Sequence, residues 1–170
     1  MQAVLWPLLL QVILIALNAV FACAEIAVIS VNDNKLAQLV AQGDKRALRL
    51  ARLTSRPAQF LATIQIAITL SGFLGSAFAA DHFSDRLVAL LLRAGVPIPE
   101  KTLDTLSVIL ITLLLSYFTL VFGELVPKRL AMKKSESLAM GLSALISAIS
   151  AIFAPVVTVL TASTNGVLRL

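Results

Sequence analysis

Four stretches of the sequence carry no charged residue over a length that can cross a membrane. They cover residues 1–24, 57–80, 105–123 and 137–168. A bilayer core of about 30 Å is crossed by about 20 apolar residues in a helix that rises about 1.5 Å per residue. Hydrophobic residues make up 59% of the chain and charged residues only 14%, which excludes a soluble enzyme, a disordered chain and a disulfide scaffold. The sequence therefore predicts an all-α integral membrane protein.

The first three stretches are predicted to be transmembrane helices, at about residues 3–31, 57–80 and 103–126. The first stretch lacks the basic start of a signal peptide, and its apolar character continues to Val31. We therefore expect it to remain in the protein as a span.

The fourth stretch allows two interpretations. It is long enough to span, but Pro155 divides it, and a proline removes a helical hydrogen bond and strains the turn before it. Three serines on one face, Ser143, Ser147 and Ser150, make the segment partly polar. It is predicted to be either a fourth span or a helical hairpin at about 136–168 that lies in the cytoplasmic interface.

The loops give the predicted orientation. The connector 32–56 holds six basic and two acidic residues, the connector 81–104 holds three basic and four acidic residues, and the segment 128–136 holds four basic residues and one acidic residue. Because lysine and arginine in loops mark the cytoplasmic side, the N-terminus is predicted outside. Topology and anionic lipid account for the basic charge, so no nucleic-acid partner is expected.

Two short helices are expected in the first inside connector, at the membrane surface. Asn32, Asp33 and Asn34 are residue types that cap a helix, here over 35–42, and Gly43 is a residue type that ends one. A second helix is predicted over 44–53.

Glu25 and Glu124 stand apart from the other seven acidic residues, which lie in connectors or at span ends. A carboxylate at membrane depth is costly and therefore a candidate for function, although each could also be hydrated at the interface. Near Glu124, Pro127 has no amide to offer the carbonyl of Gly123. A carbonyl beside a carboxylate suits a hard cation such as Mg²⁺ or Na⁺. The alternative is a proline kink that ends the helix at the interface.

Each predicted span has one face of polar and small residues. Such faces most often pack helices, because small residues allow close approach and hydroxyls hydrogen-bond across helices. We predict packing roles for Gly72, Gly75, Ser76 and Ser116. The larger polar groups of Asn18, Gln65 and Thr69 are the better ligand candidates.

The sequence contains no pattern that indicates an enzyme. HExxH, Walker, GxSxG and CxxC motifs are missing, and His82 and Cys23 are the single histidine and cysteine. We expect a protein without catalytic activity.

Three motif regions together carry a resemblance to a known family. They are Asn18 to Glu25, Phe60 to Leu70, and the run Phe-Gly-Glu-Leu-Val-Pro-Lys at 122–128. Across essentially all 170 residues the chain resembles the transmembrane domain of the cyclin M (CNNM)/CorC family of magnesium transporters, which includes bacterial hemolysin-like proteins. The Gly-Glu-x-x-Pro-Lys element is the most specific region of the resemblance.

The resemblance implies a homodimer in the bacterial inner membrane, with three spans, the N-terminus outside and the C-terminus in the cytoplasm. It also implies Mg²⁺ export coupled to Na⁺. An odd number of spans favours the hairpin at 136–168. Because family members continue into cytoplasmic CBS modules, which this sequence lacks, we expect it to belong to a longer protein.

The family's site uses oxygens from all three spans, and the match here is partial. Gly123 and Glu124 match, as do Asn18 and Glu25, whereas Ala22 and Ala24 replace common hydroxyls. The second span of this chain offers fewer polar ligand residues than the second span of many family members does. The predicted metal ligands are Glu124, Gly123, Asn18, Thr69, Ser71, Gln65 and Glu25, with Pro127 as a structural kink. The rival hypothesis is a non-transporting dimeric anchor for a cytoplasmic CBS-type sensor.

Overall fold

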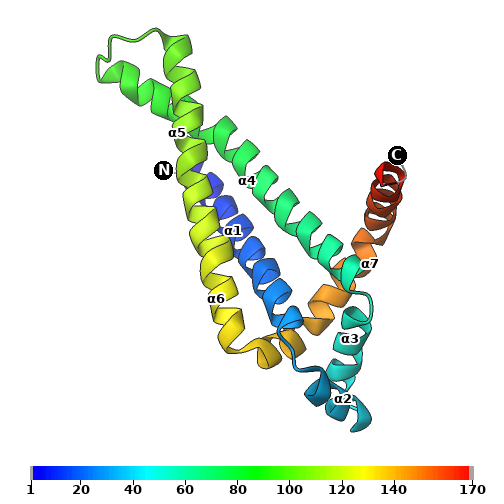
Figure 1. Cartoon of the computed structure of the whole chain (residues 1–170). Coiled ribbons are helices and arrows are strands. Elements are labelled where there is room, and N and C mark those ends of the chain that lie inside the picture. Colours follow the sequence, from blue (N-terminus) through cyan, green and yellow to red (C-terminus); the bar gives the residue numbers. More distant parts are fainter. Residues whose placement is uncertain (1, 169–170) are drawn as a thin grey trace. The chain divides into compact units, whose positions relative to one another are not determined.

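The computed structural model describes residues 2–168, and it describes side chains for 5–80 and 82–168. The described residues are helical almost throughout and contain no strand, which confirms the all-α prediction (Figure 1). Their elements are α1 (Gln2–Ile29), α2 (Asp33–Ala41), α3 (Lys45–Thr54), α4 (Pro57–Arg93), α5 (Glu100–Leu120), the π-helical turn η1 (Val121–Leu125), α6 (Val126–Lys133) and α7 (Ser135–Val167).

The described residues form two compact units. The first unit combines residues 2–20 with 69–126, and so holds the beginning of α1, most of α4, and all of α5 and η1. The second unit combines residues 21–68 with 127–168, and holds the end of α1, α2, α3, the start of α4, α6 and α7.

In the first unit, α4 and α5 form a helical hairpin that turns through residues 94–99 (Figure 1). The helix α4 continues to Arg93, well past the predicted span end at residue 80. Its 37 residues give a length of about 55 Å. The residues after 80 were predicted to form a connector, but no glycine or proline interrupts them before Gly95, which adopts a positive φ of 75°.

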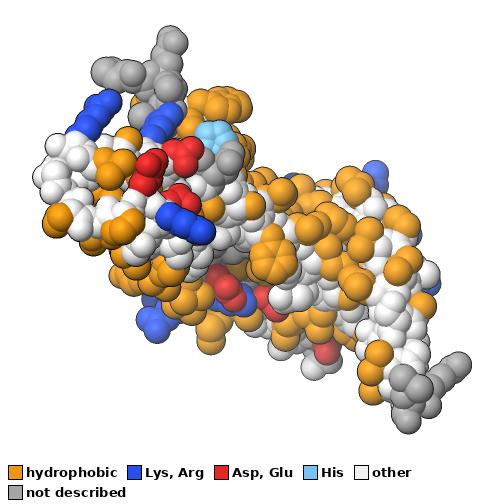
Figure 2. All heavy atoms as spheres, turned by 90° about the horizontal axis from the view of Figure 1, so that it is seen from above, with side chains coloured by type: hydrophobic (Ala, Val, Ile, Leu, Met, Phe, Trp, Pro, Cys, Tyr) orange, Lys and Arg blue, Asp and Glu red, His pale blue; other side chains and the backbone are white. Residues whose placement is uncertain are grey.

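The turn end of this hairpin is polar, unlike most of its length. Figure 2 shows acidic and basic side chains gathered there with His82. Ser84 Oγ of α4 donates to Asp104 Oδ1 of α5 at 3.3 Å. The charged residues that the sequence analysis assigned to a connector therefore lie on the ends of two helices, beyond a segment of membrane length.

In the second unit, the two short helices begin and end close to their predicted positions. Asn32 Oδ1 accepts from the Lys35 amide at 3.2 Å and caps α2. Gly43 follows the end of α2 with a positive φ of 80°. Asp44 Oδ1 then caps α3, accepting from the amides of Arg46 at 2.7 Å and Ala47 at 3.1 Å. Side-chain oxygens at both N-caps satisfy amides that the helix itself cannot pair.

The core of the second unit joins the short helices to the long ones. Leu50 of α3, Ile64 of α4 and Ile146 of α7 are almost completely buried in one hydrophobic cluster. Lys35 of α2 forms an ion pair with Glu136 of α7. Ser135 Oγ donates to the carbonyl of Ser30 at 3.3 Å. The start of α7 is thus held to α2 and to the end of α1.

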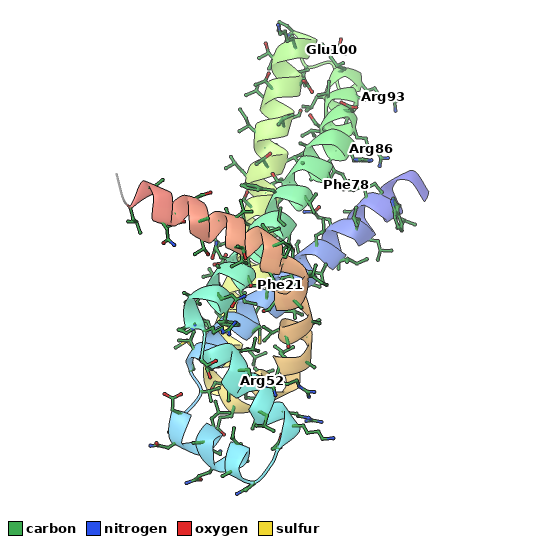
Figure 3. All side chains as sticks on the ribbon, turned by 90° about the vertical axis from the view of Figure 1, so that its right-hand side faces the viewer. Phe21, Arg52, Phe78, Arg86, Arg93 and Glu100 are labelled. Atoms are coloured by element: carbon green, nitrogen blue, oxygen red, sulfur yellow. The ribbon has the colours of Figure 1, made fainter. Side chains whose placement is uncertain are left out.

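The fourth apolar stretch forms one helix, so the prediction of a helix–break–helix hairpin is not matched. Helix α7 is continuous over Ser135–Val167 with Pro155 inside it, and it bends along its length (Figure 3). A proline removes one hydrogen bond and bends a helix without necessarily ending it. By length and composition four helices in the described residues can cross a membrane, so the count of three spans is not confirmed.

The cap of α3 predicts a pH dependence of its stability. The amides of Ala47 and Arg46 hold the pKa of Asp44 below its usual value, because they bind the ionised carboxylate. This stabilising contribution is therefore fully present above the unfolded-state pKa of about 3.9 and is lost as the pH falls through the lower folded-state pKa. We expect the protection of the amides at the start of α3 against hydrogen exchange, measured relative to the unstructured chain at the same pH, to fall below about pH 4. Asp44→Asn keeps an oxygen acceptor and should remove the pH dependence, and an unchanged profile in that variant would contradict the assignment.

Candidate cation site

A groove in the first unit, with polar residues set among apolar ones, brings together residues of α1, α4, α5 and η1. Its volume is about 360 Å³. This exceeds what several waters need, so the groove has space for a cation that keeps some of its hydration shell. The lining residues are Gln11, Thr69, Gly72, Phe73, Ser76, Leu115, Ser116, Thr119, Leu120 and Glu124. Two predicted ligands, Thr69 and Glu124, therefore share this groove.

Glu124 lies half-buried on the π-helical turn η1. In this turn the amide of Val126 donates to the carbonyl of Val121, five residues earlier. Pro127 follows as the second residue of α6 and has no amide to offer the carbonyl of Gly123, four residues earlier. The helix does not end before Pro127 but continues through this widened turn. Turns of this kind are rare and frequently occur at functional sites.

Asn18 lies against the same turn. Its Nδ2 donates to the carbonyl of Gly123 at 3.2 Å, across 105 residues of sequence. The carbonyl that the sequence predicts to lack a partner therefore accepts a hydrogen bond. Asn18 is 3% exposed, and within the described residues its Oδ1 has no hydrogen-bond partner. The contact brings two predicted ligands together and leaves the Asn18 oxygen as an available acceptor.

The absence of a side chain at Gly123 is what permits this contact. A Cβ at Gly123 would lie 3.2 Å from Asn18 Nδ2 and 3.3 Å from the carbonyl oxygen of Ile15. Gly75 of α4 has the same role towards another residue of α1, since its Cβ would lie 3.1 Å from Gln11 Nε2. At Gly72 a Cβ would meet nothing within 4 Å, so close packing within this unit does not explain that glycine. The other two predicted packing residues, Ser76 and Ser116, line the groove.

Five of the seven predicted ligands are not among the residues that line the groove: Asn18 and Gly123, which lie beside it at the turn that carries Glu124, and Glu25, Gln65 and Ser71. Glu25 belongs to the second unit, where its Oε2 lies 3.0 Å from Nζ of Lys128. Both side chains of that ion pair are partly buried, at 21% and 27% exposure. Gln65 is an exposed residue of the second unit, and Ser71 is a half-buried residue of α4 outside the lining set. Their predicted ligand roles remain predictions.

Gln11 is a groove residue that the sequence analysis did not single out. It is 4% exposed, and within the described residues its Oε1 has no hydrogen-bond partner. Gln11 lies seven residues before Asn18, on the same helical face. Extending the polar stripe of the first span backwards by that spacing would have found it.

Carboxylates are scarce at this site. Among the described residues, no three His, Cys, Asp or Glu side chains lie close enough to hold a metal ion together. Glu124 is the one acidic residue in the lining of the groove. Any ion held there would therefore meet one carboxylate and several neutral amide, hydroxyl and carbonyl oxygens. Hard cations accept such oxygen ligands.

Comparison with known proteins gives the chain its family. The family model described as the cyclin M transmembrane N-terminal domain matches residues 9–170. The chain belongs to this family. The match covers α1 from residue 9, both short helices, the α4–α5 hairpin, η1, α6 and α7, and so includes every groove residue. The resemblance drawn from the Gly-Glu-x-x-Pro-Lys element is confirmed, and the cyclin M domain is of a transporter type rather than an enzyme type.

Relatives of this domain occur in several bacteria. The UPF0053 protein sll0260 of Synechocystis is 35% identical over 158 residues, which are 93% of this chain and 35% of that protein. UPF0053 protein YhdP of Bacillus subtilis is 30% identical over 133 residues, 78% of this chain and 30% of that protein. A protein of Haemophilus influenzae named polyamine export protein is 30% identical over 148 residues, 86% of this chain and 33% of that protein. The chain thus spans about a third of the length of these relatives.

Two glycines of α4, Gly72 in the groove lining and Gly75 against Gln11, are expected to respond differently to a large side chain. Gly75→Leu should destabilise the chain by about 1–3 kcal/mol, because the new side chain displaces Gln11 from its contact. At Gly72 a Cβ meets nothing within 4 Å, so Gly72→Leu should leave stability unchanged or raise it by up to about 1 kcal/mol through helix propensity. Thermal unfolding of the two purified variants in the same detergent measures both effects. Equal stability of the two would contradict a packing role for Gly75.

Proposed function

We propose that this chain forms a cation site of a membrane transporter, and that its cargo is Mg²⁺, exported in exchange for Na⁺. The observation that carries the proposal is the half-buried Glu124 carboxylate in a groove of a membrane-length helical hairpin, beside Thr69 and the Asn18–Gly123 contact. An ionisable residue within a membrane segment is costly, and an opposite charge nearby lowers that cost. A cation passing through the groove supplies such a charge.

The oxygens at the groove and beside it support a hard cation. Glu124 offers a carboxylate, Asn18 offers an amide oxygen without a partner in the described residues, and Thr69 offers a hydroxyl. Mg²⁺ is bound through one or two carboxylates while it keeps several waters, and the groove has room for those waters. We propose Glu124, Asn18 and Thr69 as ligands, with Gly123 holding Asn18 in position.

An organic polycation is a second candidate cargo. One relative is named a polyamine export protein, and the groove here has apolar walls from Phe73, Leu115 and Leu120 beside its polar residues. An alkylammonium chain presents charged ends and apolar methylenes, which suit such a lining. Binding of putrescine is therefore tested next to that of the metal ions.

The test is the thermal unfolding of the purified chain with Mg²⁺, Mn²⁺, Na⁺ or putrescine, at ionic strength held constant with choline chloride. A ligand that binds only the folded state raises stability by about 2.7 kcal/mol at a concentration of about 100 times its dissociation constant. We expect a saturable stabilisation by Mg²⁺. If only putrescine stabilises the chain, the cargo is an organic polycation rather than Mg²⁺. If none of the four stabilises it, the non-transporting anchor for a CBS-type sensor is favoured.

The wider arrangement belongs to the same proposal. We propose a homodimer in the bacterial inner membrane with the N-terminus outside, the connector that holds α2 and α3 in the cytoplasm, and CBS modules in the full-length protein. The loop charges support this orientation, since the connector 32–56 holds six basic residues against two acidic ones. The partners are membrane lipid and a second copy, and no nucleic acid is involved.

Thiol labelling of intact cells tests the orientation. In a Cys23→Ala background, we expect an impermeant reagent to label Asp85→Cys, at the outer end of α4, and to leave Gln42→Cys unlabelled. Leu168→Cys should also be unlabelled if the C-terminal end of α7 lies in the cytoplasm. Labelling at 42 without labelling at 85 would reverse the orientation, and labelling at 168 would make α7 a fourth span.

A further inference from the structure

Gln11 is a buried polar residue that the proposed Mg²⁺ site does not use. It lies in the span formed by α1, is 4% exposed, and lines the groove with Ser76 and Ser116. Within the described residues its Oε1 is buried and has no hydrogen-bond partner. A buried acceptor without a donor costs free energy, and the cost is greater in a membrane, where lipid offers no replacement.

A glycine of α4 leaves the space that this side chain occupies. Gly75 of α4 lies against it, and a Cβ there would come within 3.1 Å of Gln11 Nε2. The close approach of α4 therefore depends on a glycine opposite Gln11. A carboxamide that served only to fill space could be replaced by an apolar side chain without leaving a buried oxygen unpaired.

Gln11 and Asn18 repeat the same chemistry at two levels of α1. They are seven residues apart, or about 10 Å along the helix axis, and on the same face. Each carries a buried amide oxygen that has no partner in the described residues. Asn18 lies beside the turn that carries Glu124, while Gln11 lies closer to the N-terminal end of α1.

We propose that the Gln11 carboxamide oxygen, together with the hydroxyls of Ser76 and Ser116, forms a second cation site in the groove, and that this site takes a monovalent cation, Na⁺. The inference rests on the proposed transport function and adds a separate position for the second ion. In the proposed orientation this position lies on the outer side of Asn18.

The ligand chemistry favours a monovalent ion at this level. Gln11, Ser76 and Ser116 offer only neutral oxygens, and the one acidic residue in the groove lining is Glu124. Mg²⁺ dehydrates reluctantly and is held through carboxylates, so a set of neutral oxygens selects weakly for it. Na⁺ carries half the charge, and neutral carbonyl oxygens coordinate it in other membrane transporters. Because the Gln11 oxygen is itself buried in the structure, binding at this site requires the carboxamide to rotate about its last torsion and bring Oε1 into the groove that the residue lines.

The test is a Na⁺ titration of the purified chain, with choline as the balancing cation and thermal unfolding as the readout. We expect a saturable rise in melting temperature for the wild type. Gln11→Leu removes the oxygen and should abolish that rise, while its melting temperature without Na⁺ should equal or exceed that of the wild type. Ser107→Ala is the matched control, because Ser107 is also a buried residue of this unit whose hydroxyl has no partner in the described residues, but it lies outside the groove. It should keep the full response.

A second variant covers the case in which Gln11→Leu does not fold. Gln11→Glu keeps the shape and adds a negative charge, so it should lower the half-saturating Na⁺ concentration by about tenfold or more. A full Na⁺ response in Gln11→Leu, an unchanged half-saturation in Gln11→Glu, or no Na⁺ response in the wild type would each overturn the proposal. The stabilisation by Mg²⁺ is measured in parallel. If Gln11→Leu keeps this stabilisation, the Mg²⁺ site and the Na⁺ site are separate. If the wild type shows no stabilisation by Mg²⁺, the proposed Mg²⁺ cargo is wrong, while the result for the Na⁺ site still stands.

Discussion

Glu124→Gln is expected to remove most of the Mg²⁺-dependent stabilisation of this chain while leaving the fold intact. The substitution keeps the size of the side chain and an oxygen acceptor, but it removes the negative charge that balances a bound cation. Glu124 is half-buried at the groove and is the one acidic residue in its lining, so no other carboxylate there replaces it. Without the Glu124 carboxylate, a bound Mg²⁺ ion would have no negative charge beside it within the membrane segment, which is costly in free energy.

The size of the effect can be set before the experiment. At Mg²⁺ about 100 times the wild-type dissociation constant, the stabilisation is about 2.7 kcal/mol. A loss of about 100-fold in affinity reduces it to about 0.4 kcal/mol at the same concentration. Asn18→Ala and Thr69→Ala should fall between these values, because each removes a neutral oxygen rather than the charge. The measurement is thermal unfolding across a Mg²⁺ series.

Glu100→Gln is the matched control for this prediction. It is the same chemical change in the same hairpin, at an exposed position in the first turn of α5 and outside the groove. It should retain the full Mg²⁺ response. If Glu124→Gln also retained the full response, Glu124 would not be a ligand.

The apolar architecture was predictable from the sequence because it depends on local properties. The absence of charge over membrane length predicted the long helices, and Asn32, Gly43 and Asp44 predicted the ends of the two short ones. Caps and glycine turns act within three or four residues of themselves, so their effect is visible in the sequence. The prediction was less accurate where charged residues suggested a helix end but no glycine or proline ended the helix. The continuation of α4 from residue 80 to Arg93 is an example.

Proline was the least reliable signal. At Pro155 a break was expected, yet α7 continues through it. At Pro127 a kink that ends the helix was one of two interpretations, yet the turn before it widens into a π-helix and the helix continues. In both places one missing amide removes one hydrogen bond, and whether the helix ends, bends or widens depends on its surroundings. Those surroundings cannot be inferred from the proline itself.

The candidate site was only partly predicted. Periodicity placed Thr69 on the polar face of its helix, and the Gly-Glu-x-x-Pro-Lys element indicated Glu124. Periodicity does not reveal which partner a polar group finds, so the Asn18–Gly123 contact and the pairing of Glu25 with Lys128 were not foreseen. Gln11 was missed because no motif includes it, although the spacing to Asn18 contains the signal.

Gly123→Ala is expected to destabilise the chain in the absence of any added cation. Two effects oppose each other at this position. Alanine favours helical backbone over glycine by up to about 1 kcal/mol. The added Cβ, however, would lie 3.2 Å from Asn18 Nδ2 and 3.3 Å from the carbonyl oxygen of Ile15, and overpacking of this kind costs about 1–3 kcal/mol. Because the Ile15 oxygen belongs to the backbone of a helix, it yields less easily than a side chain would.

The clash should prevail, with a net loss of about 1–2 kcal/mol in the free energy of unfolding. Gly141→Ala is the control, since a Cβ there meets nothing within 4 Å and only the gain in helix propensity remains. A double-mutant cycle with Asn18→Ala separates the two contacts. Asn18→Ala already removes the hydrogen bond to Gly123 and the nearest clashing atom, so adding Gly123→Ala should cost less than it does in the wild type. The cost that remains is due to Ile15, and fully additive losses would mean that Asn18 and Gly123 do not act as a pair.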